Sequence, residues 1–221
     1  MIPLADDTRR PLTFPIATYS LIGLNFVVFF FELFLGDPFI NQWSLVPNSI
    51  VHGQGLITLL TSMFLHEGWE HILGNMLFLW VFGPNVEDVM GPALYTIFYL
   101  ICGLAASAAQ IAIDPTSTIP NLGASGAIAG VLGGFILEFP GDEIRTLAFF
   151  GLGIFTYRLS AIVMIGFWFL LQFFSGIGEV ATQAVGGGGV AFFAHVGGFI
   201  CGLVLIKLFA RRPPTGVGVQ Y

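Results

Sequence analysis

Four polar side chains lie inside otherwise apolar stretches of this sequence. His71 and Asn75 are spaced i and i+4, so they share one helix face, while Ser125 lies in GASGAIAGVLGG and His195 in AHVGGFICG. A serine hydroxyl becomes a good nucleophile when a neighbouring histidine accepts its proton. The Asn75 amide, the His71 imidazole and the Ser125 backbone N–H are donors suited to a developing oxyanion. These residue types predict acyl transfer by a Ser–His dyad.

Each of these residues also has a structural interpretation. A serine at a helix start is often a cap, and a histidine or asparagine inside a helix bundle often bridges neighbouring helices by hydrogen bonds. The glycines around Ser125 and His195 can serve packing alone, since Gly126 with Gly130 and Gly198 with Gly202 form small-xxx-small pairs. No aspartate is placed to orient His195, so we expect a dyad rather than a triad.

The composition indicates what kind of protein must position these groups. The chain has 221 residues, of which 56% are hydrophobic and 9% are charged, against about 25% charged in an ordinary soluble domain. We therefore predict an all-α, polytopic membrane protein. Apolar stretches long enough to span a bilayer predict six helices, at about residues 16–35, 69–86, 92–113, 123–139, 159–174 and 190–210. For the apolar run 146–157 we favour an interfacial helix over an early extension of the fifth span.

The charges predict the orientation of these spans, because positive residues accumulate on the cytoplasmic side. All seven basic residues fall in the amino-terminal tail, in the fourth connection or at the carboxyl end of the chain, at Arg9, Arg10, Arg145, Arg158, Lys207, Arg211 and Arg212. Both termini are therefore expected in the cytoplasm, with tails at 1–15 and 211–221 around a transmembrane domain at 16–210. The second, fourth and sixth spans then run inward, which brings the four polar residues to one depth near the outer face.

Several further expectations follow from the charge balance and from single residues. The net charge of −6 and the lack of a basic patch exclude nucleic-acid binding. Cys102 and Cys201 lie in apolar runs without paired spacing, so we interpret them as core thiols and expect no metal site. Glu32, near the outer end of the first span, is interpreted as interfacial. The four glycines at 186–189 favour a flexible outer flap.

Three strings together carry a family resemblance. HEGWEHILGNM from His66 to Met76, GASGAIAG from Gly123 to Gly130 and AHVGGFICG from Ala194 to Gly202 occur in this order, and with them the chain resembles bacterial six-span rhomboid intramembrane serine proteases. The resemblance implies a role for each of the motif residues. Ser125 is the implied nucleophile and His195 its base, with His71 and Asn75 in the oxyanion hole, His66 organising the first connection, and Gly123, Gly126, Gly198 and Gly202 holding the dyad together.

The resemblance also implies the partners and the location. Substrates would be single transmembrane helices of membrane proteins, cut near the outer boundary of a bacterial plasma membrane, and no metal or organic cofactor is implied. Two features depart from some family members: Ala129 stands where an aromatic residue would stack on the histidine, and the first connection lacks a Trp–Arg pair. The alternatives are a non-catalytic relative that binds transmembrane helices, and a small-solute transporter, which should carry polar residues on both sides of the midplane.

Overall fold

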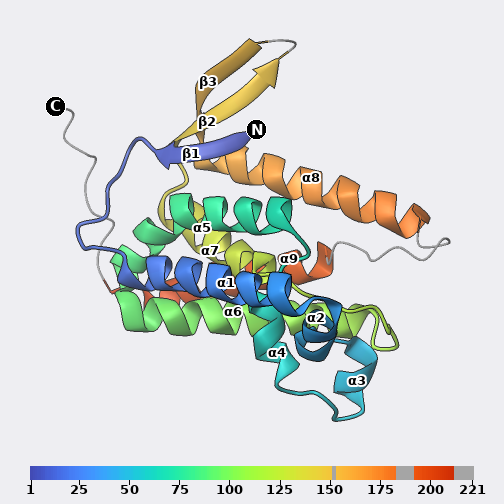
Figure 1. Cartoon of the computed structure of the whole chain (residues 1–221). Coiled ribbons are helices and arrows are strands. Elements are labelled where there is room, and N and C mark those ends of the chain that lie inside the picture. The colour runs from blue at the N-terminus through green and yellow to red at the C-terminus, as the bar shows by residue number, and fades with distance from the viewer. Residues whose placement is uncertain (151–152, 183–191, 212–221) are drawn as a thin grey trace.

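The computed structural model describes residues 1–150, 153–182 and 192–211, and it is mostly helical (Figure 1). Its helices and strands are, in chain order, β1 (Ile2–Asp6), α1 (Ile16–Leu35), α2 (Asp37–Trp43), α3 (Pro47–Val51), α4 (Thr58–Thr61), the short 3₁₀ helix η1 (Ser62–Phe64), α5 (Trp69–Met90), α6 (Pro92–Ile113), α7 (Ser125–Glu138), β2 (Glu143–Phe150), β3 (Gly153–Ser160), α8 (Ala161–Thr182) and α9 (Phe192–Phe209).

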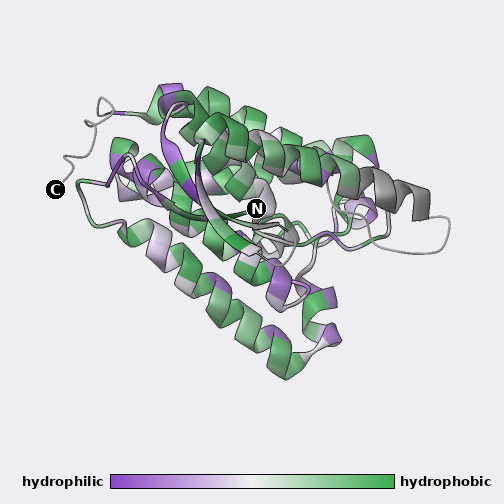
Figure 2. Cartoon of the chain, turned by 90° about the horizontal axis from the view of Figure 1, so that it is seen from above, coloured by the Kyte–Doolittle hydropathy of each residue, from purple (hydrophilic) through white to green (hydrophobic). Residues whose placement is uncertain are grey.

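Two helices have the bounds expected from the sequence. α1 begins after Pro15 and ends at Gly36, whose φ of 66° lies outside the helical region. α6 begins with Pro92, where the missing N–H would have no partner within the helix anyway. Hydrophobic residues predominate along the helices (Figure 2). Among the described residues, three helices are long and apolar enough to cross a membrane, namely α1, α6 and α9.

The other three expected spans are also helices, with different lengths or compositions. α7 has 14 residues, and the apolar part of α8 ends at Phe174. α5 extends beyond its expected end to Met90, and it contains Pro84. Its last turns carry Glu87 and Asp88, which are buried among other polar groups. Length and hydropathy therefore identify half of the expected spans, and the six-span count stays a prediction.

The core of the bundle lies between α5, α6, α7 and α9. Phe82 of α5 packs edge-to-face on Phe135 of α7, with ring centroids 4.9 Å apart. Tyr95, Phe98 and Tyr99 of α6 are fully buried beside them. α1 lies along α5 and α6, whereas α8 slants away from the other long helices (Figure 1). Of the helices that carry the sequence motifs, α5 and α7 have most of their residues buried, whereas α9 is more exposed.

A three-stranded antiparallel sheet corrects two expectations. Within residues 146–157, predicted as an interfacial helix, the described residues 146–150 and 153–157 belong to β2 and β3, and Thr146 pairs with Tyr157. β1 adds a third strand, pairing Ile2 with Leu147, so the fold is not all-α. Aromatic and β-branched residues are frequent in the run, and both kinds favour strands. Length and hydropathy alone could not separate this hairpin from a short helix.

Two buried acids near the end of α5 hold the segment that links β1 to the start of α1. The carboxylate of Glu87 accepts hydrogen bonds from the backbone N–H groups of Ala17 and Thr18 and from the Thr18 hydroxyl, at 2.7–2.9 Å. It thereby caps the amino terminus of α1, where backbone N–H groups lack partners within the helix. Asp88 accepts from the backbone N–H and the hydroxyl of Thr13. These contacts fix the amino-terminal segment to the end of α5.

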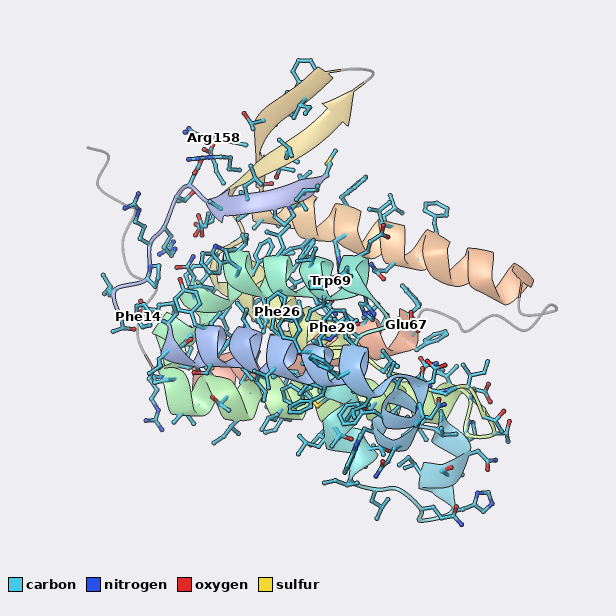
Figure 3. The ribbon with its side chains drawn as sticks, viewed as in Figure 1. Phe14, Phe26, Phe29, Glu67, Trp69 and Arg158 are labelled. Atoms are coloured by element: carbon cyan, nitrogen blue, oxygen red, sulfur yellow. The ribbon has the colours of Figure 1, made fainter. Side chains whose placement is uncertain are left out.

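The sheet itself is held by hydrogen bonds and ion pairs of Asp6 and Asp7. Asn85 of α5 donates to Asp6, and burial raises the pKa of Asp6 to about 6. Hydrogen bonding from Arg145 lowers the pKa of Asp7, which also pairs with Arg158; Arg158 marks the base of the hairpin (Figure 3). We call this part of the molecule the sheet end, defined by Asp6, Asp7, Asn85, Glu87 and Asp88.

Two expectations fall outside the described residues. The glycine flap at 186–189 and the carboxyl-terminal tail beyond residue 211 belong to the part of the chain that the structure leaves undescribed. The long first connection is described, and it folds into α2, α3, α4 and η1. The first connection is therefore a segment with regular secondary structure and not a linker.

Candidate active site

Ser125 and His195 lie in hydrogen-bond contact although 70 residues separate them. Ser125 is the first residue of α7, and His195 lies in the first turn of α9. His195 Nε2 is 2.7 Å from Ser125 Oγ, which is the distance expected for a strong hydrogen bond. His195 is only 4% exposed, while Ser125 is half-buried. A base is thus held against a hydroxyl that a ligand can still reach.

Glycines explain how α7 and α9 approach so closely. A Cβ atom at Gly198 would overlap the carbonyl group of Gly126, and one at Gly202 would overlap that of Gly130. Only residues without a side chain allow this distance between two helix backbones. The glycine pairs noted in the sequence therefore face each other across α7 and α9, directly beneath the dyad.

Gly123 shapes the turn that leads into Ser125. Its φ is 129°, a conformation that residues with a Cβ rarely adopt. Its backbone N–H donates to the carbonyl of Ser62 at 2.9 Å. A Cβ there would lie 3.0 Å from the His71 ring. His71 therefore lies against the turn that places the serine.

His66 and Glu32 form a second layer behind His71. The rings of His66 and His71 pack edge-to-face with centroids 5.1 Å apart. The backbone N–H of His66 donates to the Glu32 carboxylate, whose oxygens lie 3.0 and 3.2 Å from the nitrogen. Glu32 is 3% exposed, so its interpretation as an interfacial side chain is wrong. Burial, with His71 nearby, lowers the pKa of His66 to about 3, so His66 is neutral at pH 7.

Aromatic packing between α1 and α5 supports this layer. Phe29 of α1 and Trp69 of α5 meet edge-to-face with ring centroids 5.0 Å apart, close to Glu67 in the loop before α5 (Figure 3). The start of α5, which carries His71, is thereby fixed to α1.

Asn75 lies one turn after His71 on α5 and is half-buried. Its Nδ2 is buried and has no hydrogen-bond partner among the described residues. A buried donor without a partner costs free energy, about 1–3 kcal/mol. Such a donor is available to a ligand oxygen.

The ring of His195 is held differently from the histidine of a catalytic triad. Its Nδ1 is buried, and within the described ranges it has no hydrogen-bond partner. The ring instead packs against Trp168 of α8, with centroids 5.2 Å apart and planes inclined by 56°. Ala129 is fully buried and offers no ring. Sequence reasoning missed Trp168; the signal was the single tryptophan in the fifth expected span.

A small cavity opens beside the serine. Its volume is about 50 Å³, enough for one or two water molecules or a small side chain. Gln110 of α6 lines it, and its Oε1 is buried without a partner among the residues described. Other lining residues are Leu45, Ser62, Met63, Ser107 and Asn121. Polar groups thus line a cavity next to the nucleophile.

The described residues contain no group of three His, Cys, Asp or Glu side chains that could hold a metal ion. Cys102 and Cys201 are free thiols; Cys102 is buried and Cys201 is half-buried.

Comparison with known proteins identifies the family. A family model described as the Rhomboid domain matches residues 53–212, which is more than half of the chain. The chain belongs to the rhomboid family. As a rhomboid protein with apolar helices of membrane-spanning length, it is an integral membrane protein.

Several rhomboid relatives have similar sequences. Rhomboid protease GluP of Bacillus subtilis is 35% identical over 55% of this chain and 24% of its own length. Rhomboid protein 1, mitochondrial, of Saccharomyces cerevisiae is 31% identical over 59% of this chain and 39% of its own length. Rhomboid-like protein 11, chloroplastic, of Arabidopsis thaliana is 25% identical over 96% of this chain and 72% of its own length. The chain thus spans well under half of the first two relatives.

Proposed function

We propose that this rhomboid protein is an intramembrane serine endopeptidase that uses a Ser–His dyad. The contact of 2.7 Å between His195 Nε2 and Ser125 Oγ carries this proposal. The resemblance to a protein named as a rhomboid protease supports it. Both residues of the dyad are present, which favours an enzyme over a helix-binding relative without activity.

The reaction follows from the geometry of the dyad. Ser125 Oγ attacks the scissile carbonyl carbon while His195 Nε2 accepts the hydroxyl proton. The tetrahedral intermediate collapses as the carbon–nitrogen bond breaks, and the imidazolium gives its proton to the leaving amine. An acyl-enzyme remains on Ser125. His195 then takes a proton from a water molecule, which attacks the ester, and the carboxyl product leaves with Ser125 restored.

The negative oxygen of each tetrahedral intermediate needs donors. We assign this role to the Ser125 backbone N–H, the Asn75 amide and the His71 imidazole. The unpartnered Nδ2 of Asn75 and the position of His71 against Gly123 support the assignment. Donors held in place before the reaction stabilise the transition state, and one such donor contributes about 10²–10³ in rate.

The substrate class follows from the membrane setting. We propose that single-span membrane proteins are cut near the outer face of a bacterial plasma membrane. In this proposal six spans place both termini in the cytoplasm, and His66 holds the first connection. The cavity beside Ser125 and Gln110 suits a small side chain next to the cut bond. The reaction requires no cofactor.

The decisive experiment reconstitutes the purified chain in liposomes with a model single-span substrate. Wild type and Ser125→Ala are compared by gel, and the products are identified by mass spectrometry. We expect cleavage near the membrane boundary by wild type and none by Ser125→Ala. If several substrates remain intact and a serine-reactive fluorophosphonate fails to label Ser125, the protein is a non-catalytic helix-binding relative.

A further inference from the structure

The orientation of the His195 ring rests on few contacts. One ring nitrogen, Nε2, is hydrogen-bonded to Ser125 Oγ. The other, Nδ1, has no hydrogen-bond partner in the described part of the chain. A histidine base usually has a second partner that fixes its ring and tautomer. In this protein, packing against the His195 ring must fix the orientation that a carboxylate fixes in a catalytic triad.

Trp168 is the aromatic residue in that position. Its ring centroid is 5.2 Å from that of His195, within the range in which aromatic rings attract one another. The other neighbours of Trp168 are aromatic as well: Phe78 of α5 at 5.9 Å and the adjacent Phe169 at 4.9 Å. Trp168 is therefore held between α5 and α9 and leaves the His195 ring little room to turn.

The same residue also attaches α8 to the bundle. α8 slants away from the other long helices (Figure 1). Its described contacts with α5 and α9 include Trp168 with Phe78 and His195, and Phe169 with Phe199 at 4.6 Å. Undocking α8 would move Trp168 away from His195. The position of one peripheral helix and the orientation of the base are thus coupled through a single side chain.

We propose that Trp168 is a positioning residue for His195: its ring fixes the orientation in which the imidazole faces Ser125. This inference rests on the proposed protease function.

The test compares two neighbouring aromatic residues of α8. Trp168→Ala removes the ring that contacts His195. Phe169→Ala is the matched control, because it removes the neighbouring ring of α8, which contacts Phe199 of α9, and leaves the Trp168 ring that contacts His195. Trp168→Phe keeps an aromatic ring and serves as the conservative variant. Each protein is assayed in liposomes for kcat and KM, and in detergent for the rate of Ser125 labelling by a fluorophosphonate.

We expect Trp168→Ala to lower kcat and the labelling rate about tenfold, with KM changed less than about twofold. Trp168→Phe should recover most of this loss. Phe169→Ala should keep the labelling rate within about twofold of wild type. Thermal unfolding of all variants in detergent checks that they fold.

Two results would overturn the inference. One is faster cleavage by Trp168→Ala, which would make Trp168 a barrier to substrate. The other is an equal loss of labelling in Phe169→Ala, which would reduce Trp168 to a docking contact. A wild-type protein that neither cleaves nor reacts with the probe would instead refute the protease function itself, and the inference with it.

Discussion

The two ends of the helix bundle use polar residues in opposite ways. At the sheet end, the buried acids are paired: Glu87 accepts three hydrogen bonds and Asp88 accepts two. At the other end, which we call the dyad end (Ser125, His195, His66, His71 and Asn75), buried nitrogens of three of these side chains have no partner among the described residues. Satisfied groups stabilise a fold, while groups without partners stay available for a ligand.

The comparison predicts that substitutions at the dyad end change turnover more than stability. We expect His195→Ala to lower kcat by about 10⁴ or more, because His195 is the base that contacts Ser125 Oγ. Asn75→Ala should lower it by about 10²–10³ through loss of an oxyanion donor. Steady-state cleavage in liposomes measures both, with melting temperatures as the control for folding. Retained cleavage in His195→Ala would contradict the dyad.

A smaller effect is expected where packing supports the chemistry. Gly198→Ala places a methyl group against the Gly126 carbonyl, which pushes α7 from α9 and separates the dyad. Misplacement by about 1 Å can cost about 10² in rate, and overpacking costs about 1–3 kcal/mol. The control is Gly23→Ala, since nothing lies within 4 Å of a Cβ at Gly23. Equal activity of the two variants would show that the glycine contact is not needed.

At the sheet end, the comparison predicts a loss of stability without a loss of chemistry. Glu87→Ala leaves the buried donors of Ala17 and Thr18 unpaired, which should lower the free energy of unfolding by about 3 kcal/mol. Turnover below the melting temperature should be unchanged. Glu143→Gln is the control, because its ion pair with Arg158 is exposed and 3.8 Å long. A turnover defect in Glu87→Ala would show that the two ends are coupled.

The smallest expected effect is a dependence of stability on pH through His66. The pKa of His66 is lowered from 6.5 to about 3 in the folded protein, so unfolding binds a proton between these values. The contribution of His66 to stability is therefore complete above pH 6.5 and decreases as the pH falls, by up to about 1.4 kcal/mol per pH unit. Unfolding of wild type and His66→Phe in mixed micelles at pH 7, 6 and 5 isolates this contribution, because Asp6, with its pKa raised to about 6, acts with the opposite sign in the same range. We expect a smaller slope in His66→Phe.

Much of this arrangement can be read from local sequence. The bounds of α1 and α6 were predicted from the lengths of two apolar runs, and Pro15, Gly36, Gly91 and Pro92 lie at or next to these bounds. The pairing of Ser125 with His195 was predicted from motif order and glycine spacing. Both depend on residues that are close in the sequence or on patterns that recur within one helix.

The features that sequence reasoning missed depend on distant partners. The β2–β3 hairpin has the hydropathy of a short helix, and the third strand of the sheet comes from residues 2–6. Burial of Glu32 requires the backbone N–H of His66, which is 34 residues away. The contact of Trp168 with His195 depends on how α8 docks. Local patterns, such as the β-branched and aromatic residues of the hairpin, give only part of the signal, because each result also needs a partner from a distant segment.

The pairing of β1 with β2 also has a consequence for biosynthesis. Register partners such as Ile2 and Leu147 are separated by about 140 residues, which takes a ribosome roughly 7–30 s to add at about 5–20 residues per second. During that interval β1 has no strand partner, while α1, α5, α6 and α7 are synthesised and can be inserted. Closure of the sheet is therefore a late step, and it reports that the chain has been assembled at least through β2.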